Sequence, residues 1–99
     1  MSRNLTFRPA AVKDVADAFK WYEEQRPGLG QEFVLELEAA MQRIEKNPEL
    51  ARIFHRQARK VRLRRFPFLV VYVLTPEKIS IVSVFHCSRN PSILRQRLR

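Results

Sequence analysis

The sequence predicts a single α+β domain, residues 1–99, in which an antiparallel helical hairpin packs on one face of a largely antiparallel sheet of about four strands. Two observations support this fold class. Segments in the first half repeat apolar residues with helical spacing, whereas segments in the second half alternate apolar and polar residues or run continuously apolar. A chain of 99 residues has room for one such sheet and a few helices. The expected order is an N-terminal strand, two helices, three strands and a short C-terminal helix (β-α-α-β-β-β-α).

The N-terminal strand is expected at residues 4–8, where Leu5 and Phe7 alternate with polar residues until Pro9 stops the run. Proline is accepted in the first turn of a helix, and residues 9–25 then carry apolar side chains at helical spacing. These apolar positions are Val12, Val15, Ala16, Phe19 and Tyr22.

The second helix is expected between a tight turn and a proline. Residues 26–30, RPGLG, provide the turn, and the helix ends at Asn47 because Pro48 follows. Two helices joined by so short a turn form an antiparallel hairpin. The apolar face of the second helix comprises Phe33, Val34, Leu37, Met41 and Ile44.

Three consecutive strands, arranged as a meander, are expected in the second half. Residues 60–66, KVRLRRF, alternate apolar and basic side chains, which indicates a strand with one buried face and one basic face. Residues 67–74, PFLVVYVL, are continuously apolar, which indicates a central strand covered on both faces. After a short turn, residues 78–88 form the third strand. The C-terminal helix then begins with Asn90 as its cap and Pro91 in its first turn.

The positive charge is concentrated in the second half of the chain. The formal net charge is +9, yet residues 1–50 hold seven Lys or Arg against nine Asp or Glu. Residues 51–99 hold twelve Lys or Arg against Glu77 alone. A surface this one-sided attracts polyanions or an acidic protein partner. The alternative is a basic face that is only solvated, although so many like charges repel one another.

The composition excludes several classes of protein. No stretch approaches the roughly 20 continuous apolar residues of a membrane span, and the N-terminus MSRNLTFRP lacks the apolar core of a signal peptide. A cytoplasmic protein without membrane association is therefore expected. The single cysteine, Cys87, precludes an internal disulfide and supplies too few thiolates for a structural zinc site. No metal and no cofactor is implied.

The segment FHCSRNP, residues 85–91, places a possible nucleophile, a base and an anion-binding group next to one another. Successive side chains of a strand point to opposite faces, so Cys87 faces away from His86 and Ser88 and a Cys-His dyad is not expected. We expect Cys87 to be a small buried hydrophobic residue. His86 and Arg89 remain as candidates for proton transfer or for contact with an anion.

Three longer segments, WYEEQRPGLGQEF (residues 21–33), FPFLVVY (66–72) and VFHCSRNP (84–91), follow one another along the chain. In this order and spacing they resemble the ParE/RelE superfamily of bacterial toxins from type II toxin-antitoxin systems, and the likeness extends over nearly the whole chain. The resemblance implies a small, basic, cytoplasmic α+β toxin that a cognate antitoxin neutralises. An acidic, amphipathic antitoxin segment docked across the basic strand and the helical groove would bury apolar area and offset charge, which gives a hetero-oligomer.

The two branches of the superfamily imply different activities. RelE-like members are ribosome-dependent endoribonucleases with an arginine in the central strand, where this chain has Leu69, and they tend to carry a C-terminal tyrosine, which the tail SILRQRLR lacks. ParE-like members bind DNA gyrase and begin the central strand with FPY, which FPFLVVY matches with Phe68 in the tyrosine place. They also carry a histidine and an arginine before a proline, as FHCSRNP does.

The favoured interpretation is therefore a ParE-like toxin that inhibits DNA gyrase and needs no catalytic residue of its own. The first alternative is a ribosome-dependent ribonuclease in which His86 acts as general base and Arg89 as phosphate clamp. The second is a non-catalytic basic module that binds nucleic acid.

The residues expected at the interfaces come from the basic strand and the C-terminal segment. Those expected to contact the target or nucleic acid are Arg62, Arg64, His86, Arg89 and Arg95. Those expected to contact the antitoxin are Trp21, Lys60, Arg62 and Arg64. Trp21 falls off the apolar stripe of its helix, so it either meets a partner or packs partly buried at the edge of the hairpin. The strand cations either bind a partner or form a solvated face.

Overall fold

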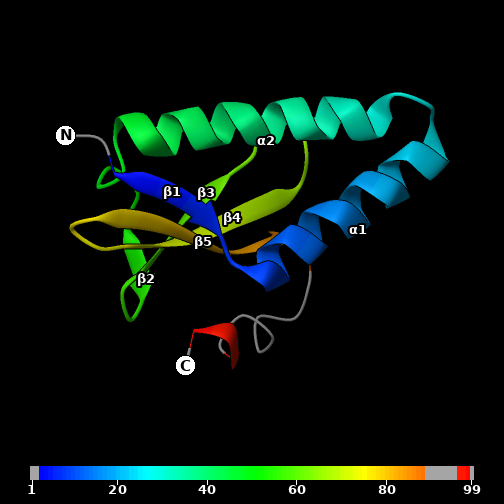
Figure 1. Ribbon diagram of the computed structural model, residues 1–99. Coiled ribbons are helices and arrows are strands. Elements are labelled where there is room, and N and C mark those ends of the chain that lie inside the picture. Colours follow the sequence, from blue (N-terminus) through cyan, green and yellow to red (C-terminus); the bar gives the residue numbers. More distant parts are fainter. Residues whose placement is uncertain (1–2, 89–95, 99) are drawn as a thin grey trace.

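The computed structural model describes residues 3–88 and 96–98, and it arranges them as a helical hairpin on one face of a sheet (Figure 1). The helices are α1, Pro9–Gln25, and α2, Leu29–Lys46. The strands are β1 (Asn4–Phe7), β2 (Ile53–His55), β3 (Ala58–Arg62), β4 (Phe68–Leu74) and β5 (Lys78–His86). The predicted α+β class, the helical hairpin and the N-terminal strand are confirmed.

The sheet has the strand order β1-β5-β4-β3-β2. Strands β3, β4 and β5 form the predicted antiparallel meander, and β4 lies at its centre. The N-terminal strand β1 adds to the free side of β5 and runs parallel to it, with Leu5 opposite Ile79. This parallel pairing is possible because the two helices carry the chain across the sheet between β1 and the meander. Three of the four strand pairs are antiparallel, so the sheet is mixed but largely antiparallel.

Two details of the predicted strands are wrong. The sheet has five strands in place of about four, because the three-residue β2 pairs with the first two residues of β3, Ala58 and Arg59. A strand this short has too few residues to show a period in the sequence. In addition, β3 ends at Arg62, so Arg64 lies in the loop that leads to β4 and does not continue the row of strand cations. The predicted C-terminal helix begins outside the described residues.

The main core lies between the helices and the sheet. Phe33, Ile44, Val70, Tyr72 and Ile81 are each at most 1% exposed in this layer. The opposite face of the sheet carries a smaller apolar cluster of Ala58, Val71 and Phe85, against which Leu69, Val73 and Leu98 pack. The central strand is therefore covered on both faces, as its continuous apolar run predicts.

The face of α1 that turns inward differs from the predicted one. Its buried residues are Ala11, Asp14, Ala18 and Tyr22, whereas Val12 and Phe19 are 54% and 37% exposed. The helix is rotated because small residues let it approach the edge of β5 closely, and its larger apolar residues line an open groove beside α2. This groove is lined by Phe7, Val12, Val15, Ala16, Phe19, Val34 and Leu37.

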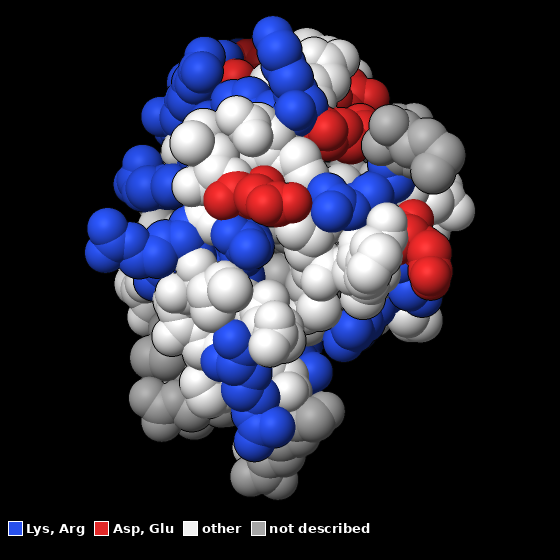
Figure 2. All heavy atoms as spheres, turned by 90° about the vertical axis from the view of Figure 1, so that its left-hand side faces the viewer, with Lys and Arg blue, Asp and Glu red and all other residues white. Residues whose placement is uncertain are grey.

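Lys and Arg dominate one end of the molecule. Figure 2 looks at the end that lies on the left of Figure 1, where α2 finishes and the β2–β3 hairpin begins, and it shows many more basic than acidic side chains. The charge segregation seen along the sequence is therefore also a segregation in space.

The two helices approach most closely at Gly30, in the first turn of α2. A methyl group built on Gly30 would lie 2.7 Å from the carbonyl oxygen of Phe19 and 2.8 Å from a side-chain carbon of Glu23. The backbone N–H of Gly30 also donates to Oε1 of Glu23 at 2.9 Å. A hydrogen atom is the only side chain that fits this contact without moving the backbone of α1.

We expect Gly30→Ala to lower the free energy of unfolding by about 1–3 kcal/mol, because the added methyl overpacks the contact between the helices. Chemical denaturation measures the change. Gln31→Ala, at the exposed neighbouring position, is the matched control and should change stability by no more than about 0.5 kcal/mol. Equal effects of the two substitutions would contradict the close approach.

Candidate functional site

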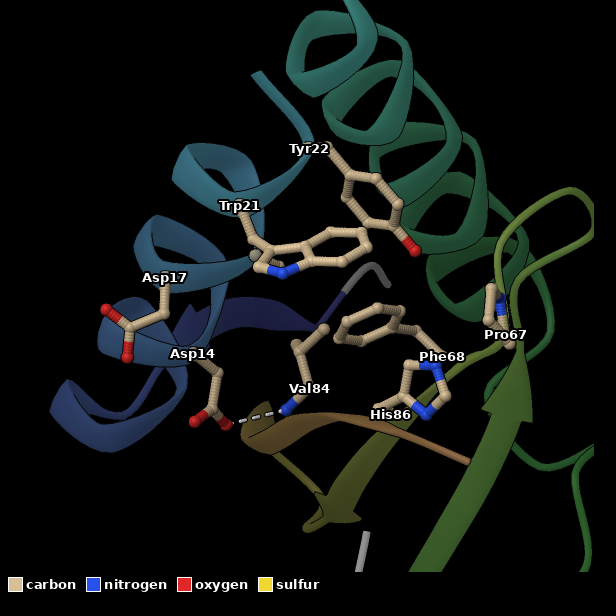
Figure 3. A pocket seen from close by; sticks show the side chains of 9 residues that line it. Asp14, Asp17, Trp21, Tyr22, Pro67, Phe68, Val84 and His86 are labelled. Atoms are coloured by element: carbon tan, nitrogen blue, oxygen red, sulfur yellow. Dashed lines mark hydrogen bonds between the residues drawn. The ribbon is translucent and has the colours of Figure 1, made fainter. Parts of the chain in front are cut away.

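A pocket opens between α1 and the ends of β4 and β5 (Figure 3). Its volume is about 510 Å³. It is lined by Asp14, Asp17, Ala18, Trp21, Tyr22, Pro67, Phe68, Val84 and His86. The aromatic side chains form its inner wall, and the two carboxylates lie at the side of α1.

The pocket exists because β1 is shorter than β5. The parallel pairing ends at Phe7 opposite Ile81, followed by one last hydrogen bond from the N–H of Arg8 to the carbonyl of Ile81. On the side where β1 ends, β5 continues to His86 with no further strand paired to it among the described residues. An unpaired edge leaves N–H groups without acceptors, and a helix that lies against such an edge must provide them from its side chains.

Asp14 of α1 provides this acceptor. Its Oδ2 accepts from the backbone N–H of Val84 at 2.9 Å and from Oγ of Ser83 at 3.3 Å. Asp14 is only 8% exposed. A carboxylate in the otherwise apolar buried face of α1 therefore attaches this helix to the edge of β5.

Arg97, near the C-terminus, completes the charge balance. Its guanidinium donates from both terminal nitrogens to the Asp14 carboxylate, with Nη2 to Oδ1 at 3.0 Å, and Nη1 also donates to Oγ of Ser83 at 2.9 Å. The hydrogen bond to Asp14 raises the pKa of Arg97 further above its usual range. Bidentate pairs of this kind fix geometry as well as charge, so the pair holds residues 96–98 beside the sheet.

Tyr22 forms the centre of the aromatic wall. Its ring lies 4.9 Å from that of Phe66 and 5.4 Å from that of Phe33, and the ring of Trp21 packs edge-on at 5.1 Å. Burial raises the pKa of the Tyr22 hydroxyl above its ordinary value near 10. Tyr22 therefore stays neutral over the physiological range and presents a buried ring to the pocket.

His86 lies at the open end of the pocket, where β5 ends. Its ring packs edge-on against Phe68 at 5.3 Å, and its Nδ1 lies 2.7 Å from Oγ of Ser88. The backbone N–H of Ser88 also donates to Nδ1, at 3.1 Å. The imidazole is therefore oriented by its own turn, and its exposed edge faces solvent.

Cys87 is exposed, so the prediction of a small buried hydrophobic residue is wrong. The strand ends at His86, and Cys87 and Ser88 already belong to a turn in which the N–H of Cys87 donates to the carbonyl of Pro67 at 2.8 Å. Alternation between the faces of a sheet therefore no longer determines where the Cys87 side chain lies. The hydrogen bonds of His86 are with Ser88.

Apart from Trp21, the other predicted binding residues that the structure describes do not gather around this pocket. Lys60 and Arg62 alternate with Val61, which packs toward the helices, so the two cations lie on the opposite face of the sheet. Arg64 is exposed in the loop after β3. Trp21 lines the pocket and is 56% exposed. Arg89 and Arg95 lie outside the described residues.

Asp14, Ser83 and Arg97 are the site residues that sequence reasoning missed. A weak signal was present, because Asp14 occupies the small-residue stripe Ala11, Asp14, Ala18, Tyr22, which has helical spacing. This weak signal was obscured by a more hydrophobic stripe on the same helix, which comprises Val12, Val15, Ala16 and Phe19. Nothing local indicates that the partner is 83 residues away.

The pocket suits an apolar or aromatic group more than a phosphate. Most of its lining is apolar, and its ionisable groups are His86, Tyr22 and the carboxylates of Asp14 and Asp17. Asp14 pairs with Arg97 and Asp17 with Lys13, and among the described residues the lining includes no Lys or Arg that could bind a phosphate. In residues 3–88 and 96–98, no group of three or more His, Cys, Asp or Glu is placed to hold a metal ion. Within the same residues, neither helix combines the length and the apolar character needed to cross a bilayer.

Comparison with known sequences finds a family and two curated relatives. The family described as "ParE toxin of type II toxin-antitoxin system, parDE" matches residues 5–91. Two proteins named Toxin ParE2, from Mycobacterium tuberculosis strains CDC 1551 / Oshkosh and ATCC 25618 / H37Rv, are each 27% identical over 99 residues. The match covers 99% of this chain and 94% of each relative.

Comparison with solved structures finds the same fold. A chain of the chromosomal ParDE toxin-antitoxin system from P. aeruginosa matches with a TM-score of 0.75 at 17% identity, over 85% of this chain and 95% of that chain. The YoeB dimer structure from Staphylococcus aureus matches with a TM-score of 0.60 at 22% identity, over 85% and 97%. At these identities the structural matches establish the arrangement of helices and strands.

We expect Asp14→Asn to lower the free energy of unfolding by about 2–3 kcal/mol, because the amide keeps the size of the side chain but loses the charge-assisted hydrogen bonds with Arg97. Urea denaturation measures the change. Asp17→Asn, one turn away in an exposed pair with Lys13, is the control and should cost less than about 0.5 kcal/mol. If the two variants were equally stable, the Asp14 network would not support the fold.

We also expect stability to fall at alkaline pH. Burial raises the pKa of both tyrosines, Tyr22 and Tyr72, above the ordinary value near 10. The folded state then holds these protons more tightly than the unfolded state, so this contribution is fully present below about pH 10 and is lost as the pH rises through the folded-state pKa values. Tyrosinate absorbance during a pH titration, with and without denaturant, measures this. A titration identical in both states would contradict it.

Proposed function

Since this chain belongs to the ParE family of toxins from type II toxin-antitoxin systems, we propose that it arrests growth by binding and inhibiting DNA gyrase, and that a cognate antitoxin neutralises it. On this proposal the chain is a protein ligand of gyrase and transfers no group itself. It works in the cytoplasm, where gyrase and its DNA substrate are found. It binds no metal and no cofactor.

The chemistry of the sheet around His86 is the observation that supports inhibition over RNA cleavage. Cleavage through a 2′-hydroxyl needs a base together with cations that stabilise the charged phosphorus centre. Leu69 stands where RelE-like sequences carry an arginine, and it packs into the apolar cluster with Val71 and Phe85. On the helix side, the lining around His86 is aromatic and acidic. His86 therefore has a better environment for contact than for phosphate chemistry.

The proposed gyrase-binding surface is the end of the sheet where β3 stops and β5 finishes. Arg62 pairs in register with Leu69 and, across β4, Leu69 pairs with Phe85, so Arg62 and His86 lie at the same end of their strands. Arg64 follows in the exposed loop. Arg89 and Arg95, proposed for the same surface, lie outside the described residues.

The proposed antitoxin is an acidic, amphipathic segment. Trp21 and the open groove of α1 and α2 offer it apolar area, and Lys60, Arg62 and Arg64 offer it positive charge. Because Trp21 and the strand cations lie on opposite faces of the sheet, an antitoxin that contacts both sets must wrap around the end of the domain. Extended, wrapping partners of this kind bury large areas at modest affinity per unit area.

We expect the purified chain to abolish supercoiling by gyrase and to increase the amount of cleaved DNA–gyrase complex. Arg62→Gln with Arg64→Gln should weaken this inhibition roughly tenfold, since arginines at the centre of an interface often dominate its affinity. The charge-matched control is Arg8→Gln with Lys20→Gln, two exposed cations that are not part of the proposed surface. Supercoiling assays measure both, and co-purified antitoxin should restore activity. Unchanged supercoiling in the presence of the chain would refute the gyrase assignment.

A substitution of His86 distinguishes the ribonuclease alternative from the inhibition of gyrase. If this residue moves a proton, His86→Ala should abolish cleavage of mRNA on translating ribosomes, by about two orders of magnitude or more. If it makes only a contact with gyrase, the variant weakens gyrase inhibition in part and no mRNA is cut by either protein. Translating ribosomes incubated with the chain and analysed for mRNA cuts decide between the two.

A further inference from the structure

The β2–β3 hairpin and its flanking residues form the most basic segment of the chain. Residues 51–65 contain six Arg and one Lys and no Asp or Glu. The hairpin lies at the edge of the sheet farthest from β1, and Figure 1 shows its tip pointing away from α2. Arg56, at this tip, has a φ of 52°, as in a tight turn, and it is exposed.

Two of these seven cations hold other parts of the chain, and Arg62 donates a long hydrogen bond to the carbonyl of its neighbour Leu63, at 3.5 Å. Arg59 donates to the backbone carbonyls of Glu49 and Ala51 at 3.0 and 2.6 Å, and Arg65 pairs with Glu32 at 2.8 Å. The other five have no carboxylate partner among the described residues, which include all ten Asp and Glu of the chain. All five are exposed: Arg52, Arg56, Lys60, Arg62 and Arg64.

An aromatic side chain stands among these cations. Phe54 is 37% exposed on the edge strand β2, and its neighbour Ile53 is 44% exposed. The Lys60 ammonium lies 4.8 Å from the centroid of the Phe54 ring. A flat apolar ring is thereby fixed next to a charge on the face of the sheet that carries Arg62.

We propose that the β2–β3 hairpin binds single-stranded nucleic acid, with its free cations on successive phosphates and Phe54 stacked on a base. Lys60 and Arg62 are two residues apart on one strand face, which places them about 6.6 Å apart along the strand, a spacing that suits a row of regularly repeated phosphates. Arginine dominates the segment, and its planar fork matches a phosphate better than a lysine does. Aromatic rings interleaved with cations are typical of surfaces that bind unpaired bases.

An acidic protein would also be attracted to the free cations, but the binding of such a protein does not account for the exposed Phe54 ring beside them. A base does, because every base has a face that stacks on an aromatic ring. This interaction goes beyond the proposed inhibition of gyrase and does not rest on it. It is measured on the isolated chain without gyrase present.

The test measures binding of a labelled oligothymidylate of about 12 nucleotides by fluorescence anisotropy over a range of salt concentrations. Phe54→Leu, which keeps an apolar side chain but removes the ring, should weaken binding roughly fivefold or more without changing the salt dependence. Phe54→Trp should bind at least as well as the parent chain. Arg56→Gln with Lys60→Gln should reduce the slope of log affinity against log salt by about 1.4, which corresponds to two phosphate contacts on a single strand.

The control is again Arg8→Gln with Lys20→Gln, which removes the same charge from α1 and the residue before it. The proposal is overturned if this control weakens binding as much as the hairpin variant, because the charge then acts diffusely. It is equally overturned if Phe54→Leu binds like Phe54→Trp, or if polyglutamate binds as tightly as the oligonucleotide, which would identify a surface for an acidic protein. A duplex of the same length should be insensitive to Phe54→Leu. Circular dichroism confirms that each variant is folded.

Discussion

The carboxylate of Asp14 is the interaction on which the arrangement of this fold depends most. β1 is too short to pair with the whole of β5, and the backbone beyond Ile81 would lack acceptors if α1 presented only apolar residues to it. Asp14 fills that gap from the helix, and Arg97 neutralises it from the other end of the chain. One buried side chain thereby joins the first helix, the last strand and the C-terminal segment.

The attachment of α1 to β5 through Asp14 determines where the molecule can have a pocket. Because α1 is held at the edge of β5 by a small-residue face, its aromatic residues Trp21 and Tyr22 meet Phe68 and His86 at the end of the sheet. The same rotation leaves Val12 and Phe19 on an open groove. Both apolar surfaces are therefore consequences of how the helix reaches the sheet, and both are suited to a protein partner.

The charged residues are distributed differently from these two apolar surfaces. The acidic residues belong mainly to the helices, where several pair with cations, whereas Arg56, Lys60 and Arg62 of the β2–β3 hairpin have no carboxylate partner among the described residues. On the function proposed above, the chain meets two partners, an antitoxin and gyrase. Arg62 and Arg64 are proposed for both interfaces, so occupation by one partner would exclude the other.

The sequence alone determined the order of β1, the two helices and the β3–β5 meander, the helical hairpin and the central position of β4, because each follows from a local period or from a proline or glycine nearby. The resemblance carried by the three segments identified the superfamily on the same local basis. Only the tertiary structure decided the parallel pairing of β1, the short strand β2, the inward face of α1 and the turn that exposes Cys87. It also brought Asp14 to Arg97. These features arise from contacts between residues far apart in the chain, and such contacts leave no period in the sequence because each depends on where other elements have already packed.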